Sequence, residues 1–202
     1  MYYILVMSLA YLLGSSSMSY YIARWKGIDI QNKGSKNLGA SNAMIVLGWK
    51  AAIIVGIHDI AKSALAVILA ITFFGNLPYI GAIAGVCSVL GHIFPFYLKF
   101  KGGKGFASYL GMTLALNWKL GLAICAVIVL ATLITDYIVV GTTLTITIVP
   151  TFLGIITRSF LLAAILLIGT IVIMYKHRMN YVRIIKGTEI GFRSANRGEH
   201  RV

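Results

Sequence analysis

The chain has 202 residues, of which 59% are apolar and only 11% are charged. A soluble domain of this size needs more charged side chains to cover its surface, so the composition predicts an integral membrane protein. The formal net charge of +13 does not indicate nucleic-acid binding, because the Lys and Arg residues stand in short segments beside apolar stretches, as in the cytoplasmic loops of membrane proteins.

Apolar stretches long enough to cross the hydrocarbon layer recur along the chain. We predict an all-α bundle of about seven transmembrane helices. Residues 1–190 are expected to form one transmembrane domain, and residues 191–202 a basic cytoplasmic tail. The fourth range below is short, which indicates a tilted or partly interfacial helix. The expected helical ranges are 2–23, 51–74, 79–97, 105–117, 119–135, 138–157 and 159–176.

The distribution of Lys and Arg predicts the orientation of the bundle. These residues are concentrated after the first, third and seventh ranges, and cytoplasmic loops carry such an excess. An odd number of spans then places the N-terminus outside and the C-terminus in the cytoplasm. The three segments richest in Gly, Ser, Asn, Lys and His would all lie on this cytoplasmic side. A transporter would instead place polar groups near the midplane, so the pattern favours an enzyme acting on a lipid and a cytosolic substrate.

A few polar residues and two cysteines stand within the apolar ranges. Asp59 and Lys62 are three residues apart in the second range, so they are expected to pair on one helical face. His92, in the third range, is expected to be a hydrogen-bonded residue of the bundle. Cys87 and Cys125 are interpreted as small packing residues rather than as a disulfide or a metal site.

The first polar segment, residues 33–42, precedes an apolar, helix-like run that begins at Ala43. Its small residues allow the backbone to curl tightly and to direct N–H groups into a concavity. Ser41 or Asn42 is expected to cap the following helix, whose N-terminus favours an anion. Two interpretations remain open for this segment alone, a phosphate-binding loop or a flexible cytoplasmic loop.

The second polar segment ends in two glycines between two lysines, Lys101-Gly102-Gly103-Lys104, just before another helix. Pro95 is expected to end or kink the preceding helix. The pattern is typical of a cationic anion-binding loop, although its spacing differs from that of a nucleotide-binding P-loop. A simple positive-inside signal requires charge but no paired glycines, so the pattern favours a functional loop.

The third polar segment contains His177 and Asn180, three residues apart and therefore on one helical face. A histidine at the end of a helix is usually only a favourable cation. This pair therefore gains its significance from the other two segments.

Together, the three segments resemble the motifs of the bacterial PlsY family, the acyl-phosphate-dependent glycerol-3-phosphate acyltransferases. Residues 34–42, 91–105 and 176–189 resemble the first, second and third motifs of that family in order and spacing, and the similarity spans nearly the whole chain. The resemblance implies a seven-helix bundle in the bacterial inner membrane, with an active site that faces the cytoplasm.

The resemblance also implies a reaction and its partners. A fatty acyl group is transferred from acyl phosphate to the 1-hydroxyl of glycerol 3-phosphate, which gives lysophosphatidic acid and phosphate for phospholipid synthesis. No metal, cofactor or acyl-CoA is required. The implied partners are the two substrates and membrane lipid, with no nucleic acid and no obligate protein partner.

Site residues follow from the resemblance, position by position. Ser35, Lys104 and His177 correspond to contacts with the polyol phosphate, and Asn180 lies near them, so these four are the expected catalytic residues. The glycine-rich loops correspond to the acyl-phosphate group. The expected substrate-binding residues are Gly34, Lys36, Asn37, Gly39, Ala40, Ser41, Asn42, Lys101, Gly102 and Gly103.

The chain departs from the family pattern at a few positions. Ile45 stands where the family usually has an arginine, and Val139 stands where it has a serine. Lys36 replaces the second glycine of the first motif. An arginine binds phosphate through two parallel hydrogen bonds, which a lysine reproduces only as a point charge. The departures leave open a relative that acylates a different acceptor, and a non-enzymatic lipid or anion transporter is a further alternative.

Overall fold

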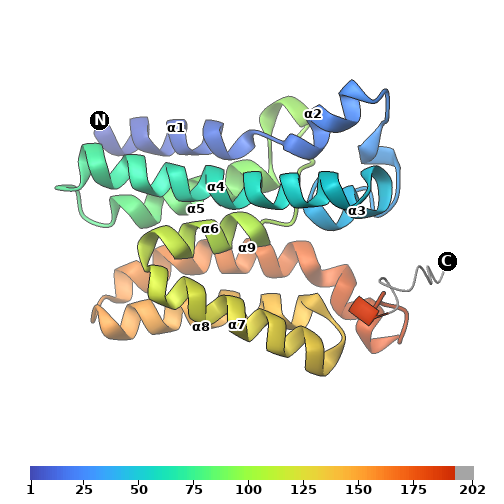
Figure 1. Ribbon diagram of the computed structural model, residues 1–202. Helices are drawn as coiled ribbons and strands as arrows, with labels where there is room; N and C mark the ends of the chain where they lie inside the picture. Colours follow the sequence, from blue (N-terminus) through green and yellow to red (C-terminus); the bar gives the residue numbers. More distant parts are fainter. Residues whose placement is uncertain (194–202) are drawn as a thin grey trace. The chain divides into compact units, whose positions relative to one another are not determined.

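The computed structural model of the protein describes residues 1–193, which are helical apart from their loops (Figure 1). Residues 194–202, most of the expected basic tail, lie outside the described part. The helices are α1 Tyr2–Ser15, α2 Met18–Trp25, α3 Ala40–Leu47, α4 Trp49–Phe74, α5 Ile80–Ile93, α6 Phe106–Leu116, α7 Trp118–Thr135, α8 Ile138–Ile156 and α9 Phe160–Ile185, with short 3-10 turns η1 Ile30–Asn32 and η2 Phe96–Leu98.

Five helical stretches of the described chain are long and apolar enough to cross a membrane. They are Trp49–Phe74, Ile80–Leu98, Trp118–Thr135, Ile138–Ile156 and Phe160–Ile185. Many of their large apolar side chains are exposed, such as Ile57, Phe73 and Ile155. Such extensive apolar exposure is typical of surfaces that face lipid. The fourth expected span corresponds to α6, which is apolar but short.

The first expected span, residues 2–23, is wrong as a single helix. The chain leaves the helical conformation at Ser16, where ψ is 132°, and Ser17 is extended. The Ser15 hydroxyl donates to the carbonyl of Tyr11 at 2.8 Å, and the Ser16 carbonyl accepts from the Lys62 ammonium at 2.7 Å. Hydroxyl side chains compete in this way with the helical hydrogen bonds, and α2 begins only at Met18.

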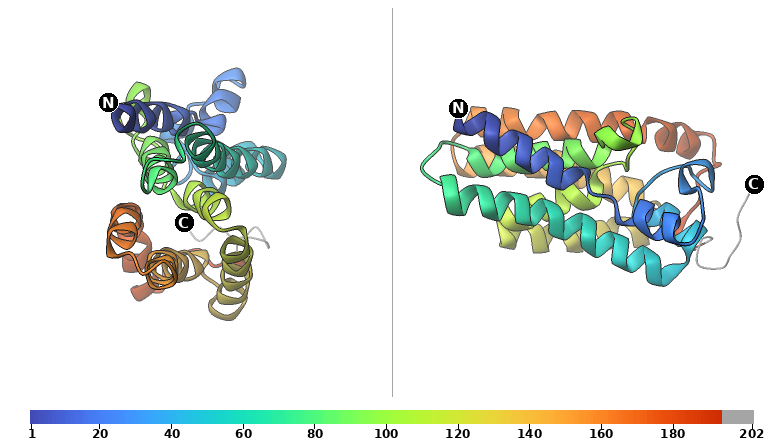
Figure 2. Two further views of the ribbon diagram at one scale, coloured as in Figure 1. Left: turned by 90° about the vertical axis from the view of Figure 1, so that its left-hand side faces the viewer. Right: turned by 90° about the horizontal axis from the view of Figure 1, so that it is seen from above.

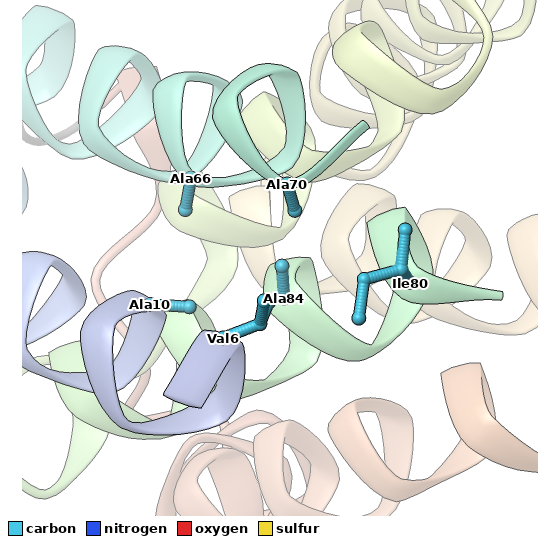
Figure 3. Close-up of a cluster of buried hydrophobic side chains, with 6 residues drawn as sticks. All are labelled: Val6, Ala10, Ala66, Ala70, Ile80 and Ala84. Atoms are coloured by element: carbon cyan, nitrogen blue, oxygen red, sulfur yellow. The ribbon is translucent and has the colours of Figure 1, made fainter. Parts of the chain in front are cut away.

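Residues 1–118 and the described residues from 119 to 193 form two compact units. In the first unit, α1, α4 and α5 lie side by side around a core of small side chains (Figure 3). Small residues let helix backbones approach closely in a membrane bundle. At Gly14, for example, an added Cβ would overlap the backbone of Ser88. The core cluster consists of Val6, Ala10, Ala66, Ala70, Ile80 and Ala84.

The polar loops of the first unit lie at the ends of its helices opposite the chain's N-terminus (Figures 1 and 2). One loop joins α2 to α3 and contains η1, and the other joins α5 to α6 and contains η2. As expected, Pro95 follows the end of α5 at Ile93. Two loops that are distant in the sequence therefore reach the same end of this unit.

The second unit contains α8 and α9, which are joined by hydrogen bonds of buried or half-buried hydroxyl groups. Thr170 donates to the carbonyl of Ile146 at 2.6 Å, and the hydroxyls of Thr143 and Tyr181 lie 2.9 Å apart. Helix α9 continues to Ile185, nine residues beyond the expected limit of 176. The expectation that His177 stands at a helix end is therefore wrong. Both cysteines of the chain are free.

Candidate active site

The loop before α3 is held by a side chain that reaches into it from the helix. The Asn42 amide oxygen accepts the N–H of Ser35 at 2.8 Å, and its nitrogen donates to the carbonyls of Ile30 and Lys33 at 3.3 and 3.2 Å. Asn42 is fully buried. Its amide therefore shapes the loop.

The expected cap of α3 is wrong. The N-cap residue is Gly39, no side chain caps the helix, and Ser41 and Asn42 lie within its first turn. The first N–H groups of a helix mostly lack partners within it, and the exposed residues Ser35 and Lys36 stand shortly before the first residue of α3, Ala40. A helix start without a side-chain cap remains a suitable place for an anionic group.

Gly34 is required by the conformation of this first loop. Its φ is +58°, in the left-handed region, and an added Cβ would overlap the amide oxygen of Asn42. Lys36 also has a left-handed backbone, with φ +56°, which is costly for a residue with a Cβ. The loop rests on a small apolar cluster of Ala23, Ile30, Leu38 and Leu98.

The loop between α5 and α6 is built from backbone contacts. The N–H of Gly102 donates to the carbonyl of Ile93, and the N–H of Gly103 donates to that of His92, both at 3.1 Å. An added Cβ at Gly102 would overlap the His92 carbonyl, and one at Gly103 would overlap the His92 ring. A side chain at either position would require a neighbouring group to shift, so the close approach of this loop to His92 favours glycine.

The two loops are joined directly. The Gln31 side chain donates to the carbonyl of Lys101 at 3.0 Å, and Leu98 packs beside Ile30 and Leu38 in the cluster described above. The structure thus brings the first and second polar segments together at one end of the first unit. Their side chains concentrate positive charge there, which raises the local concentration of anions. The contributing lysines are Lys33, Lys36, Lys99, Lys101 and Lys104.

His177 and Asn180 share one face of α9, as their spacing predicts, and both are buried. The Nδ1 of His177 lies 2.9 Å from the carbonyl of Ile173. Because a carbonyl only accepts, Nδ1 carries the proton of this hydrogen bond. The neutral ring then holds its lone pair on Nε2.

Asn180 is held by an acidic residue to which the sequence analysis assigned no role. Its amide donates to one oxygen of Glu189 at 2.6 Å, and the Arg183 guanidinium donates to the other at 2.6 Å. Glu189 stands just after Gly187, beyond the end of α9, within the third segment. The Gly-Thr-Glu pattern after the helix was the signal that could have revealed it.

The positions that depart from the family pattern differ in their surroundings. Ile45 is 46% exposed on α3, so an arginine there would need no rearrangement of a core. Val139 is buried in the first turn of α8. The apolar residue at position 139 is therefore part of the packing of the second unit.

A family model for glycerol-3-phosphate acyltransferases matches residues 4–187. The chain belongs to this family. The resemblance based on the three segments is thereby confirmed. Among relatives with the same description, the Clostridioides difficile (strain 630) protein is 37% identical over 93% of this chain and 94% of its own length. The Shouchella clausii (strain KSM-K16) protein is 38% identical over 89% and 90%.

The solved structures agree. The crystal structure of PlsY, an integral membrane glycerol 3-phosphate acyltransferase in its glycerol 3-phosphate form, is 30% identical. It has a TM-score of 0.89 and covers 97% of this chain and 98% of that one. The lysophosphatidic acid form of PlsY is 29% identical, with a TM-score of 0.83 and 95% of each chain covered. The family model and these structures thus agree over most of the chain.

Proposed function

We propose that the protein transfers a fatty acyl group from acyl phosphate to the 1-hydroxyl of glycerol 3-phosphate. The observation that carries this proposal is the pair of glycine-shaped, lysine-rich loops joined through Gln31 at one end of the first unit. Family membership supplies the acceptor, and the loops supply groups suited to phosphate. The products are lysophosphatidic acid and inorganic phosphate.

The chemistry needs little from the protein beyond binding and orientation. The new ester bond forms between the substrate hydroxyl and the acyl carbon, while the bond from that carbon to the phosphate oxygen breaks. We assign the hydroxyl proton to the released phosphate, whose oxygen gains negative charge as its bond to the acyl carbon breaks. An acyl phosphate already has a good leaving group, so no covalent enzyme intermediate is required.

The main physical obstacle is the repulsion between two phosphoryl groups brought close together. Lys101, Lys104 and the N–H groups of the loops offset it when they act away from bulk water. Holding the hydroxyl in a near-attack position then supplies a barrier reduction of about 7–11 kcal/mol. On the family resemblance we assign Ser35, Lys104, His177 and Asn180 to the glycerol phosphate, and the glycine loops to the acyl phosphate.

His177 has a defined ring nitrogen for this role. Since Nδ1 donates to Ile173, Nε2 is the atom that we assign to the substrate. A protonated ring would donate from Nε2 to a phosphate oxygen, and a neutral ring would accept the hydrogen of a hydroxyl. Glu189 fixes the Asn180 amide in the same segment.

A different acceptor is the second candidate function, and Ile45 and Val139 are the observations that favour it. An acceptor panel distinguishes the two, with the acyl phosphate held constant and glycerol 3-phosphate compared with other phosphorylated and hydroxylated acceptors. The proposal expects the highest kcat/KM for glycerol 3-phosphate. A higher value for another acceptor would overturn the assignment of the acceptor, whereas a complete lack of phosphate release would overturn the acyltransferase itself.

Lys104→Ala provides the direct test of the phosphate role. We expect turnover to fall by at least about a hundredfold, because one charge that offsets phosphate repulsion is removed. The thermal midpoint in detergent should remain near that of the unchanged protein. Lys119→Ala, a lysine at the start of α7, is the matched control for loss of a charge. Near-normal turnover of Lys104→Ala would contradict the role.

We further propose a bundle with seven spans over residues 1–190, formed by the five long helices together with α1 and α6. Its N-terminus would lie outside and its polar segments in the cytoplasm of a bacterial cell, at the inner membrane. The excess of Lys and Arg in these segments supports this orientation. Single cysteines at Lys26 and Lys119, introduced in the background Cys87→Ala/Cys125→Ala, should react with an impermeant maleimide from opposite sides. Labelling from one side only would contradict it.

A further inference from the structure

A charged cluster is buried in the first unit, behind the second glycine loop. Asp59 and Lys62 of α4 and His92 of α5 are only 2%, 4% and 6% exposed. The Lys62 ammonium lies 2.8 Å from Asp59 Oδ1, so the predicted pair is confirmed. The same nitrogen lies 2.9 Å from His92 Nδ1 and 2.7 Å from the Ser16 carbonyl.

These contacts do more than pair two charges on one helix. Asp59 and Lys62 are neighbours on α4, so their ion pair alone would connect no other element. The ammonium also reaches α5 through His92 and the junction of α1 and α2 through Ser16. Its three N–H donors match three acceptors, and it therefore joins three segments of the unit at one point.

The contact with Lys62 also decides which nitrogen of His92 carries the proton. An ammonium group has donors and no acceptor, so Nδ1 must present its lone pair to Lys62. The second neighbour of Nδ1, Asp59 Oδ1, is farther away at 3.3 Å. The proton of the neutral His92 ring is therefore on Nε2.

His92 touches the second glycine loop on two sides. Its carbonyl accepts the N–H of Gly103 at 3.1 Å. Its Nε2 occupies the space where a Cβ of Gly103 would lie. The ring and the backbone of a single residue thus support the Gly102–Gly103 segment, and the ring is oriented from behind by Lys62.

We propose that Lys62, fixed by Asp59, is a positioning residue for the transferase reaction: it orients His92 with its N–H on Nε2, and His92 in turn sets the Gly102–Gly103 segment for a phosphoryl group. An Nε2–H donor beside the loop suits an anion, whereas a lone pair there would repel one. This inference rests on the proposed function, since it treats the loop as a phosphoryl site.

The test compares two double variants that differ at position 62, where one keeps an N–H donor and the other has none. They are Asp59→Leu/Lys62→Gln and Asp59→Leu/Lys62→Met, and neither leaves an unpaired charge in the interior. Replacing a buried ion pair by apolar groups usually preserves folding. Glutamine can still donate to His92 Nδ1 and to the Ser16 carbonyl, whereas methionine cannot. Lys50→Met, which removes an exposed lysine of the same helix, is the control.

We expect the methionine variant to show a KM for at least one phosphorylated substrate that is roughly tenfold to a hundredfold above that of the glutamine variant. Its kcat should change much less, whereas its thermal midpoint should be somewhat lower, because methionine leaves the Ser16 carbonyl without the donor that glutamine supplies. Lys50→Met should match the unchanged protein. Equal KM values in the two double variants would overturn the inference, and so would a fall in kcat as large as the rise in KM in the methionine variant only.

A spectroscopic measurement separates this inference from the proposed function. Ring ¹⁵N spectra of histidine-labelled protein report which nitrogen carries the proton, and His92→Phe identifies the resonance by its loss. The unchanged protein and the glutamine variant should show an unprotonated Nδ1, and the methionine variant should show a mixture. A protonated Nδ1 in the unchanged protein would overturn the inference, even if the protein transfers acyl groups normally. Absence of turnover with the Lys62 effect on His92 intact would instead overturn the proposed function.

Discussion

The two glycine-rich loops of the first unit are held in place by different means. The loop before α3 is held by one side chain, since Asn42 makes three hydrogen bonds to its backbone. The loop before α6 is held by the backbone of α5, to which Gly102 and Gly103 donate. In the first case the side-chain amide of a helical residue reaches into the loop. In the second, the loop lies directly against the end of a helix.

This difference determines where each loop tolerates a side chain. Ser35 and Lys36 are exposed in the first loop, because the bonds of Asn42 engage the backbone and leave these side chains outside. Lys36 can therefore replace the family's glycine without disturbing a contact. At Gly102 and Gly103 the neighbouring atoms are a carbonyl and a ring, so a substitution there must displace the loop or the neighbouring group.

The largest effect is expected for Gly103→Ala, which breaks the second loop. The new Cβ would overlap the His92 ring, so the loop or the ring must shift. We expect turnover to fall by about a hundredfold, since a misplacement of phosphate-binding groups by about 1 Å is enough. The measurement is steady-state phosphate release in detergent micelles.

A glycine of α4 provides the control for this substitution. At Gly56 the nearest atom to an added Cβ is the Cβ of Ala40, at an ordinary contact distance of 3.8 Å. Gly56→Ala should leave turnover unchanged, and the better helix propensity of alanine favours folding. If Gly103→Ala had the same activity as Gly56→Ala, the tight contact with His92 would not constrain the loop.

The next largest effect is expected for Asn42→Ala, which breaks the first loop. Loss of three hydrogen bonds should lower the free energy of unfolding by about 2–4 kcal/mol, because each contributes on the order of 1 kcal/mol. The exposed loop can recover some of these bonds with water, which places the value toward the lower end. The measurement is the unfolding midpoint together with the KM values of both substrates.

Asn37→Ala is the matched control in the same loop. Asn37 is predicted to bind substrate, so this variant should weaken binding while leaving the unfolding midpoint unchanged. Asn42→Ala should affect both quantities. An unchanged midpoint for Asn42→Ala would show that the loop does not depend on its amide, and the contrast between the two loops would then fail.

The sequence indicated what kind of loops these are, but not which contacts hold them in place. The paired glycines and lysines at 101–104 indicated an anion-binding loop, because few structural demands other than close backbone approach require two adjacent glycines. The same sequence could not reveal that His92 is the residue they approach, since that depends on how the chain turns after Pro95. The cap expected at Ser41 or Asn42 failed for a similar reason. An asparagine side chain can cap a helix or form hydrogen bonds to the backbone of a loop. Tertiary contacts determine which of the two Asn42 does.

Helix limits show where hydropathy stops being informative. The apolar run over 2–23 predicted one span, but Ser15, Ser16 and Ser17 end α1, and Lys62 then binds the Ser16 carbonyl. Conversely, α9 continues past its polar residues to Ile185, because His177 and Asn180 are buried and bonded within the second unit. Polar residues with partners can therefore stand at the end of a helix, as Ser15 does, or within one, as His177 and Asn180 do.

The smallest effect is expected at Lys36, whose backbone is left-handed, as are those of Lys99 and Phe100 in the second loop. A residue with a Cβ in this conformation costs roughly 1–2 kcal/mol. Lys36→Gly removes that cost and should raise the free energy of unfolding by about 1 kcal/mol, less what the more flexible unfolded chain gains. Lys36→Ala retains the backbone cost and loses the same ammonium group. Both variants should raise the KM of a phosphorylated substrate by the same few-fold factor if the ammonium offsets phosphate charge. If KM rises only in Lys36→Gly, the ammonium has no such role, and the strained backbone itself holds the loop in its binding conformation.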